Sequence, residues 1–207
     1  MLDACAKAGA VATKQSMRHV LRGDVDGDSV ADSVALVRVR PAPERCGAFL
    51  VVRTRSGTLT RALSRPPESD VPGLNGLASL GSERRLHIVV TTWQGASTEF
   101  ARLFAVRGGR IAPVATGTAD NTFPYEGSVT HLDAVDCAPG GLVVASGWFV
   151  RGGGFGFFRH FYRLGADRLV PVRNESGTSG SASPIGHLRE FREPQPFPSC
   201  MRVRATS

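Results

Sequence analysis

The sequence carries one stretch whose residue types and spacing could bind a metal ion. Asp24, Asp26, Asp28 and Asp32 occupy positions 1, 3, 5 and 9 of a nine-residue segment. Carboxylates crowded into one turn repel one another, and a bound cation relieves that repulsion. Carboxylate oxygens at these offsets, with the backbone carbonyl of Val30 at position 7, suit a hard ion of the size of Ca²⁺. The segment therefore predicts a calcium loop. The alternative is a solvated acidic turn, because Asp and Gly are common turn residues.

The residues around this loop decide which type of calcium site it resembles. An EF-hand loop needs Gly at position 6 and Glu at position 12, where this chain has Ser29 and Ala35. The run that follows, 33–39, alternates as a β-strand does. The pattern is similar to the calcium loop of FG-GAP/VCBS repeats, found in integrin-like β-propeller blades, although Ser29 replaces the usual Gly. The resemblance implies a Ca²⁺ ion held by the residues named above, and a non-catalytic role in recognition or scaffolding.

An internal repeat supports an all-β fold independently of the loop. Residues 103–114 align without a gap to residues 161–172, at an offset of 58, and residues 51–63 fit the same pattern at an offset of 52. Each segment predicts a strand, a tight turn containing Gly, and a second strand.

Extending the repeat backwards predicts three four-stranded antiparallel units that resemble propeller blades, over residues 17–65, 70–116 and 128–173. Residues 1–16 are expected to be a flexible N-terminal segment, and residues 174–207 a polar linker and C-terminal tail, in which 199–203 could add an edge strand held by Cys200. Three blades are too few to close a ring. The alternatives are an open or partial propeller, or a homo-oligomer in which two copies assemble.

The charge of the chain indicates the kind of partner it favours, and its cysteines indicate the redox compartment. The formal net charge is +7, because the chain has 25 Lys and Arg residues and 18 Asp and Glu residues. A basic surface favours anionic partners such as a cell-surface polymer, but no motif for reading nucleic acid accompanies the arginines.

The four cysteines, Cys5, Cys46, Cys137 and Cys200, form no C-x-x-C pair. Their even number fits disulfides in an exported protein, with three possible pairings, and buried free thiols are the alternative.

The N-terminal residues leave the route of export open. Residues 1–22 lack the apolar core of a signal peptide, and no run is long enough for a transmembrane helix. Residues 2–5, Leu-Asp-Ala-Cys, are similar to the end of a lipoprotein cleavage site except for Asp3. The resemblance to calcium-loop repeats favours an extracellular or cell-envelope location.

The sequence predicts no catalytic residues. His131 and Asp133 share one face of a predicted strand, and Asp136 follows. A His–Asp pair can serve in acid–base chemistry, but a hydrogen-bonded surface pair is the plainer interpretation. Trp93 and Trp148 lie at matching places in two units and could stack on a sugar, or simply pack. The alternatives to a calcium-binding module are therefore an enzyme that acts on an anionic polysaccharide with His131 in a groove, and a cytosolic basic interaction protein without metal.

Overall fold

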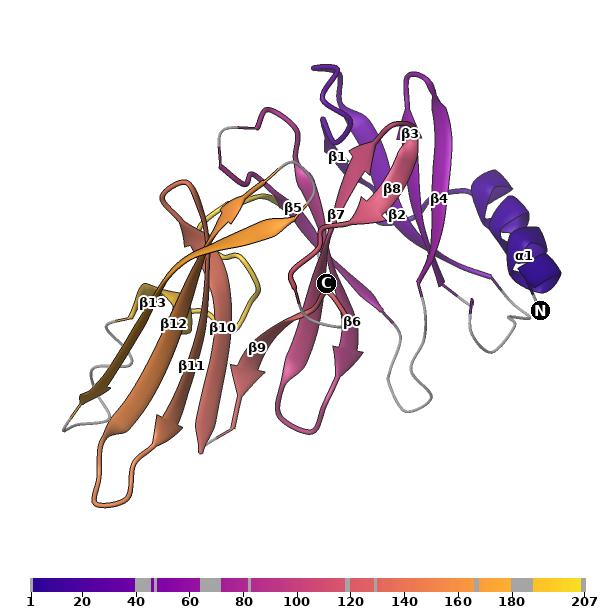
Figure 1. Cartoon of the computed structure of the whole chain (residues 1–207). Coiled ribbons are helices and arrows are strands. Elements are labelled where there is room, and N and C mark those ends of the chain that lie inside the picture. The colour runs from indigo at the N-terminus through magenta and orange to yellow at the C-terminus, as the bar shows by residue number, and fades with distance from the viewer. Residues whose placement is uncertain are drawn as a thin grey trace.

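The computed structural model describes residues 2–39, 46, 48–63, 72–81, 83–117, 120–128, 130–165, 168–179 and 188–205. Within these residues it contains one α-helix, fourteen strands and a short 3-10 turn (Figure 1). The elements are α1 (Leu2–Lys14), β1 (Leu21–Gly23), β2 (Asp32–Arg38), β3 (Ala48–Thr54), β4 (Gly57–Leu63), β5 (Gly73–Ala78), β6 (His87–Gln94), β7 (Glu99–Arg107), β8 (Arg110–Pro113), β9 (Phe123–Gly127), β10 (His131–Ala138), β11 (Gly141–Phe149), β12 (Phe155–Leu164), β13 (Leu169–Ser179), η2 (Arg189–Phe191) and β14 (Met201–Arg204). The prediction of a mostly β, antiparallel fold is confirmed.

The first four strands form a sheet of their own, in the order β1-β2-β3-β4. The two central strands are buried on both faces, because each carries a continuous apolar run, residues 34–37 in β2 and 48–52 in β3. Val34 and Val52 pair in register and face the large sheet, whereas the adjoining pair Ala35 and Val51 points the opposite way. These strands match the first predicted unit closely. The connection at residues 64–71, where the first unit was predicted to end, lies outside the described residues.

Helix α1 occupies the segment that the sequence predicted to be flexible, and this prediction is corrected. Ala8 and Ala12 are buried against Phe49 and Val51 on the outer face of the small sheet. A disulfide between Cys5 and Cys46 fixes the start of the helix to the sheet. The apolar face of the helix is made of alanines, so its burial in the fold is a weak signal in the sequence.

The second and third predicted units do not form separate blades. Their strands join in one ten-stranded sheet with the order β13-β12-β11-β10-β9-β7-β6-β5-β14, with β8 also paired to β7. Strand β9 makes the join, because it pairs with β7 at residues 99–101 and with β10 at residues 132–133. The sequence analysis missed β9, which is only five residues long and contains Pro124. The sheets are not closed, and a three-bladed propeller is not confirmed.

Strand β13 extends into the segment predicted as a linker. Phe161 pairs with Arg173 and Tyr162 with Pro171, so Val172 is the extra residue of a β-bulge. The bulge leaves Val172 exposed and lets pairing continue to Ser179. Residues 174–179 are therefore strand, and residues 180–187 lie outside the described residues.

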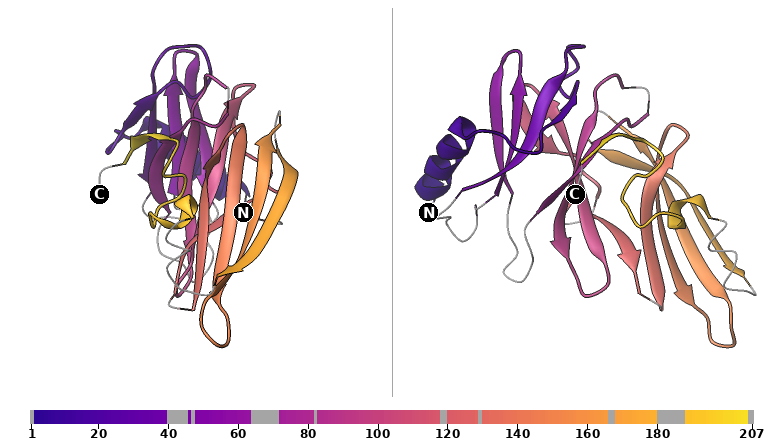
Figure 2. Two further views of the ribbon diagram at one scale, coloured as in Figure 1. Left: turned by 90° about the vertical axis from the view of Figure 1, so that its left-hand side faces the viewer. Right: turned by 180° about the vertical axis from the view of Figure 1, so that it is seen from behind.

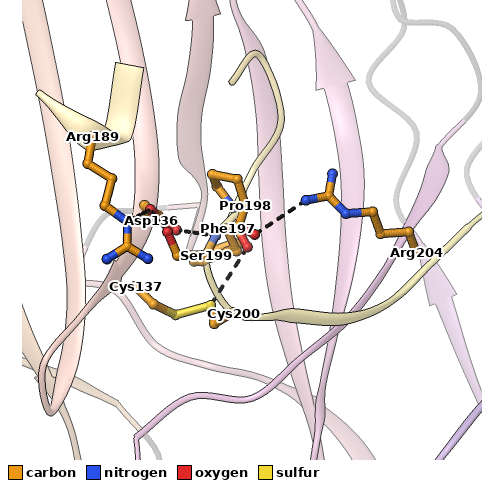
Figure 3. The surroundings of a disulfide bond; sticks show 8 residues. All are labelled: Asp136, Cys137, Arg189, Phe197, Pro198, Ser199, Cys200 and Arg204. Atoms are coloured by element: carbon orange, nitrogen blue, oxygen red, sulfur yellow. Dashed lines mark hydrogen bonds and ion pairs between the residues drawn. A yellow bond between two sulfur atoms is a disulfide. The ribbon is translucent and has the colours of Figure 1, made fainter. Parts of the chain in front are cut away.

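The C-terminal segment crosses one face of the large sheet and ends as β14 on the edge of β5, as predicted (Figure 2, right). A disulfide joins Cys200 to Cys137 of β10. Beside it, the buried carboxylate of Asp136 accepts hydrogen bonds from the backbone N–H and the hydroxyl of Ser199 (Figure 3). Phe197 is fully buried, with its ring edge-on to Phe123. The tail is thus part of the core of the large sheet.

The two sheets pack face to face through aliphatic side chains from β1–β4 and from β5–β8. His87 of β6 lies by strand alternation on the face opposite to Ile88, and it is a buried polar residue with no exposed surface and no hydrogen-bond partner for either ring nitrogen among the described residues. Burial, together with the positive charges of Arg107 and Arg85, lowers the pKa of His87 to about 4. The Glu83 carboxylate, 3.9 Å from the ring, does not offset this. His87 is therefore neutral at pH 7.

We expect each disulfide to stabilise the fold by roughly 4 kcal/mol, because the pairs close long loops, with separations of 41 and 63 residues. Urea unfolding of Cys137→Ser/Cys200→Ser and of Cys5→Ser/Cys46→Ser, each compared with wild type, measures the contribution of each disulfide to the free energy of unfolding. Only the first variant should also lose hydrogen-exchange protection in β14. Four reactive thiols in the native protein would contradict both pairings.

We expect the free energy of unfolding to fall between pH 6.5 and 4 by about 3 kcal/mol through His87 alone. In this window the unfolded chain binds a proton that the folded imidazole does not, so acid favours unfolding. The difference between wild type and His87→Gln in urea unfolding at stepwise pH isolates this contribution. Parallel pH profiles for the two proteins would show that His87 is accessible to protonation in the folded state.

Candidate metal centre

The acidic segment forms the loop between β1 and β2. Its base is closed by the last register pair of these strands, Gly23 opposite Asp32. Side-chain carboxylates fold the loop by accepting hydrogen bonds from its own backbone: Asp24 accepts from Gly27 N at 2.6 Å and from Ser29 N at 2.8 Å. Asp26 accepts from Asp28 N in the same way, at 3.1 Å. The spacing of the aspartates therefore produces consecutive Asx-type turns.

Three of the four predicted carboxylates come together. Each of Asp24, Asp26 and Asp28 offers one oxygen that lies within 4.8 Å of the other two. Calcium binds oxygen ligands at about 2.3–2.6 Å, so oxygens on opposite sides of the ion are up to about 5 Å apart. The triad is thus compact enough to surround one such ion, and its all-oxygen donor set suits Ca²⁺ better than a soft metal.

The backbone at position 6 of the loop is left-handed, as the resemblance implied, although the residue is not glycine. Ser29 has a φ of 68°, and Gly27 two residues earlier has a φ of 90°. A left-handed backbone is costly for a serine, and the hydrogen bond from Ser29 N to Asp24 helps to hold it. Val30 lies at position 7 with its side chain exposed and its N–H donated to Asp28.

Asp32 lies apart from the triad and anchors the loop from beneath. Its side chain is only 2% exposed, and its Oδ2 accepts hydrogen bonds from Val25 N at 2.9 Å and Asp26 N at 3.3 Å. Its other oxygen is buried without a partner among the described residues. Burial raises the pKa of Asp32, opposed by these backbone hydrogen bonds and assisted by the negative charges of Asp26 and Asp28. A buried carboxylate oxygen left unpaired beside three more carboxylates fits a site built to hold a cation.

The acidic loop also contacts the large sheet, which lies opposite to it. Leu86 N donates to Asp24 O at 2.7 Å, which ties the loop to the segment that leads into β6. A β-carbon added to Gly23 would lie 2.7 Å from Leu86 Cδ1 and 2.9 Å from Leu77 Cδ1, so a larger residue there would require these leucine side chains to shift. None of the charged residues opposite the loop, Glu83, Arg85 and Arg107, was predicted from the sequence as a site residue. Glu83 and Arg85 lie in the segment before β6, and Arg107 is the last residue of β7, and surface positions of this kind commonly carry charge.

The predicted His–Asp pair lies at the start of β10. His131 Nε2 lies 3.6 Å from Asp133 and 2.9 Å from Thr98 Oγ1, while Nδ1 contacts Ser128 Oγ at 3.0 Å. Both ring nitrogens therefore have partners. Asp136 lies in the buried contact with Ser199 described above and takes no part in this pair. His131 and Asp133 are thus close but not hydrogen-bonded to each other, and Asp133 Oδ1 accepts a hydrogen bond from Ser146 Oγ instead.

The two tryptophans each stack on a phenylalanine of the neighbouring strand. Trp93 lies with its ring centre 4.4 Å from that of Phe100, and Trp148 lies 5.0 Å from Phe158. Trp93 and Phe158 remain partly exposed at 39% and 48%. The rings serve packing between strands, and their exposed faces form no enclosed groove around His131 among the cavities lined by described residues.

We expect Asp32→Ala to destabilise the metal-free protein by about 2 kcal/mol, because it leaves two buried backbone N–H groups without an acceptor. Asp28→Ala is the matched control: Asp28 is exposed, and its removal relieves repulsion, so stability in chelator should be unchanged or slightly higher. Urea unfolding in chelator measures both. Equal effects of the two substitutions would contradict the anchoring role of Asp32.

Comparisons with protein-family models, curated proteins and solved structures found no match to this chain. What the protein does must therefore be argued from the chemistry of its own residues. Among the described helices none is long and apolar enough to cross a membrane.

Proposed function

We propose that the chain is a non-catalytic calcium-binding β module that serves in recognition or scaffolding at the cell envelope or outside the cell. The observation that carries this proposal is the convergence of Asp24, Asp26 and Asp28 on a loop whose base is locked by the buried Asp32. Bound there, Ca²⁺ would neutralise the carboxylates and stabilise the folded loop.

The donor set supports calcium over a merely solvated turn. The triad would supply carboxylate oxygens, and Val30 would supply its backbone carbonyl, as in the calcium loops that the segment resembles. Asp32, which the sequence also predicted as a ligand, lies outside this group of oxygens and would support the site by accepting hydrogen bonds from the loop backbone. Calcium takes six to eight oxygens and completes its shell with water, so a partly open site of this kind is normal.

Two further features support a location outside the cytosol. Both disulfides favour an oxidising compartment. Calcium at millimolar levels occupies even weak sites there. The disulfide of Cys5 leaves its thiol unavailable for lipid attachment while the bond is intact, which counts against the lipoprotein interpretation.

We also propose that the first sheet is a blade of the FG-GAP/VCBS type. The chain would then be a partial propeller, in that it contains one such blade. It is a four-stranded antiparallel meander, and its acidic loop connects the first and second strands, as in those blades. The net charge of +7 favours an anionic polymer as the partner.

Calorimetric titration of the chelator-stripped protein tests the proposal. We expect one calcium ion to bind, and the melting temperature to rise by roughly 5–10 °C at a calcium concentration 100 times Kd. Asp28→Ala should abolish or strongly weaken binding, whereas Asp120→Ala, which removes an exposed carboxylate outside the loop, should not. No heat and no thermal shift up to several millimolar calcium would refute the proposal.

A further inference from the structure

A cavity of about 670 Å³ lies where the acidic loop faces the large sheet. One wall carries Asp26 and Asp28 of the loop, and the β3–β4 turn adds the hydroxyls of Thr54 and Ser56. The opposite wall comes from the segment before β6 and from the β7–β8 turn. At least two of the proposed calcium ligands therefore line an open cavity, and water or a ligand reaching a cation there would enter through it.

The opposite wall presents two arginines in a fixed arrangement. Arg85 Nε lies 3.1 Å from Glu83 Oε2 and its Nη1 donates to Val106 O at 3.3 Å, while Arg107 Nη2 lies 3.4 Å from Glu83 Oε1. Glu83 thus holds both guanidinium groups. Arg107 Nε is buried with no hydrogen-bond partner among the described residues, and the donors on the two side chains outnumber these acceptors. Spare donors on a guanidinium suit a carboxylate ligand.

We propose that this cavity binds a saccharide that carries a carboxylate, with the carboxylate held between a cation on the acidic loop and the guanidinium groups of Arg85 and Arg107. The inference rests on the proposed function, because it needs calcium on the loop. It goes further by naming the ligand class, the residues that recognise it and the place where it binds.

The charge of the lining makes this binding depend on the cation. Three carboxylates and two guanidinium groups line the cavity, so their formal sum is −1. A carboxylate ligand would be repelled by Asp26 and Asp28 while the loop is empty. With a divalent ion on the loop the sum becomes +1, and the ion offers the ligand a position in its coordination shell.

The lining also favours a saccharide over a peptide. Hydroxyl, carboxylate and guanidinium groups, which pair with sugar hydroxyls, are contributed by seven of the described lining residues, and among these described residues Leu59 and Val106 have the apolar side chains. Gly108 and Gly109 form the rim at the β7–β8 turn, and a β-carbon built on either would meet nothing within 4 Å. The rim is therefore open enough for a residue within a longer polymer chain.

The test uses trigalacturonate as the probe and its methyl ester as the neutral counterpart, titrated into the full chain with calcium and in chelator. We expect binding only with calcium and only to the free acid. Arg107→Gln should weaken it about tenfold or more, and Arg85→Gln should do the same, while the calcium affinity of each stays within about twofold of wild type. Arg110→Gln, on the same turn but outside the lining, is the matched control and should bind normally.

The outcomes separate this inference from the proposed function. If calcium binds but trigalacturonate does not, or if the ester, the chelated protein or the arginine variants bind equally well, the inference is overturned and the calcium module stands. Stronger binding of triglutamate than of trigalacturonate would overturn the saccharide assignment. If the calcium titration itself is silent, both fail. Thermal melting of Arg107→Gln and Arg85→Gln establishes that the variants are folded.

Discussion

Repulsion among carboxylates within one short loop is the constraint around which this part of the molecule is built. Asp24, Asp26 and Asp28 have oxygens within 4.8 Å of one another, and a fourth carboxylate, Asp32, is buried beneath them. Hydrogen bonds from the loop's own N–H groups offset part of the repulsion. They also hold the three carboxylates close to one another, which is the arrangement that the proposed calcium site requires.

Contacts with the surrounding strands hold the acidic loop in place, in addition to the hydrogen bonds within the loop. The loop is closed at its base by β1 and β2, and it is tied to the large sheet by the bond from Leu86 N to Asp24 O. Aliphatic packing between the two sheets fixes the distance between the acidic loop and the arginines on the other side. Helix α1 and the C-terminal segment cover the remaining faces, each secured by a disulfide. The acidic loop and the cavity beside it therefore lie between two sheets that are packed against each other.

The sequence predicted local structure well, because alternation and turn residues act over short distances. The strands of the first unit, the three hairpins and the edge strand after Cys200 all follow from such patterns. It failed where the outcome depends on distant pairing. Strand β9 merges two predicted units into one sheet, the bulge at Val172 extends β13, and small alanines bury α1. For the site, spacing identified the four aspartates, but only the fold separates the buried Asp32 from the triad and brings Arg85 and Arg107 opposite to it.

The most direct test of the central claim is a crystal structure grown in calcium, with anomalous diffraction data to locate the ion. We expect one strong anomalous peak among the carboxylates of Asp24, Asp26 and Asp28, at about 2.3–2.6 Å from their oxygens. A water-like peak without anomalous signal at that position, in crystals saturated with calcium, would contradict the account and leave the four aspartates as a solvated turn.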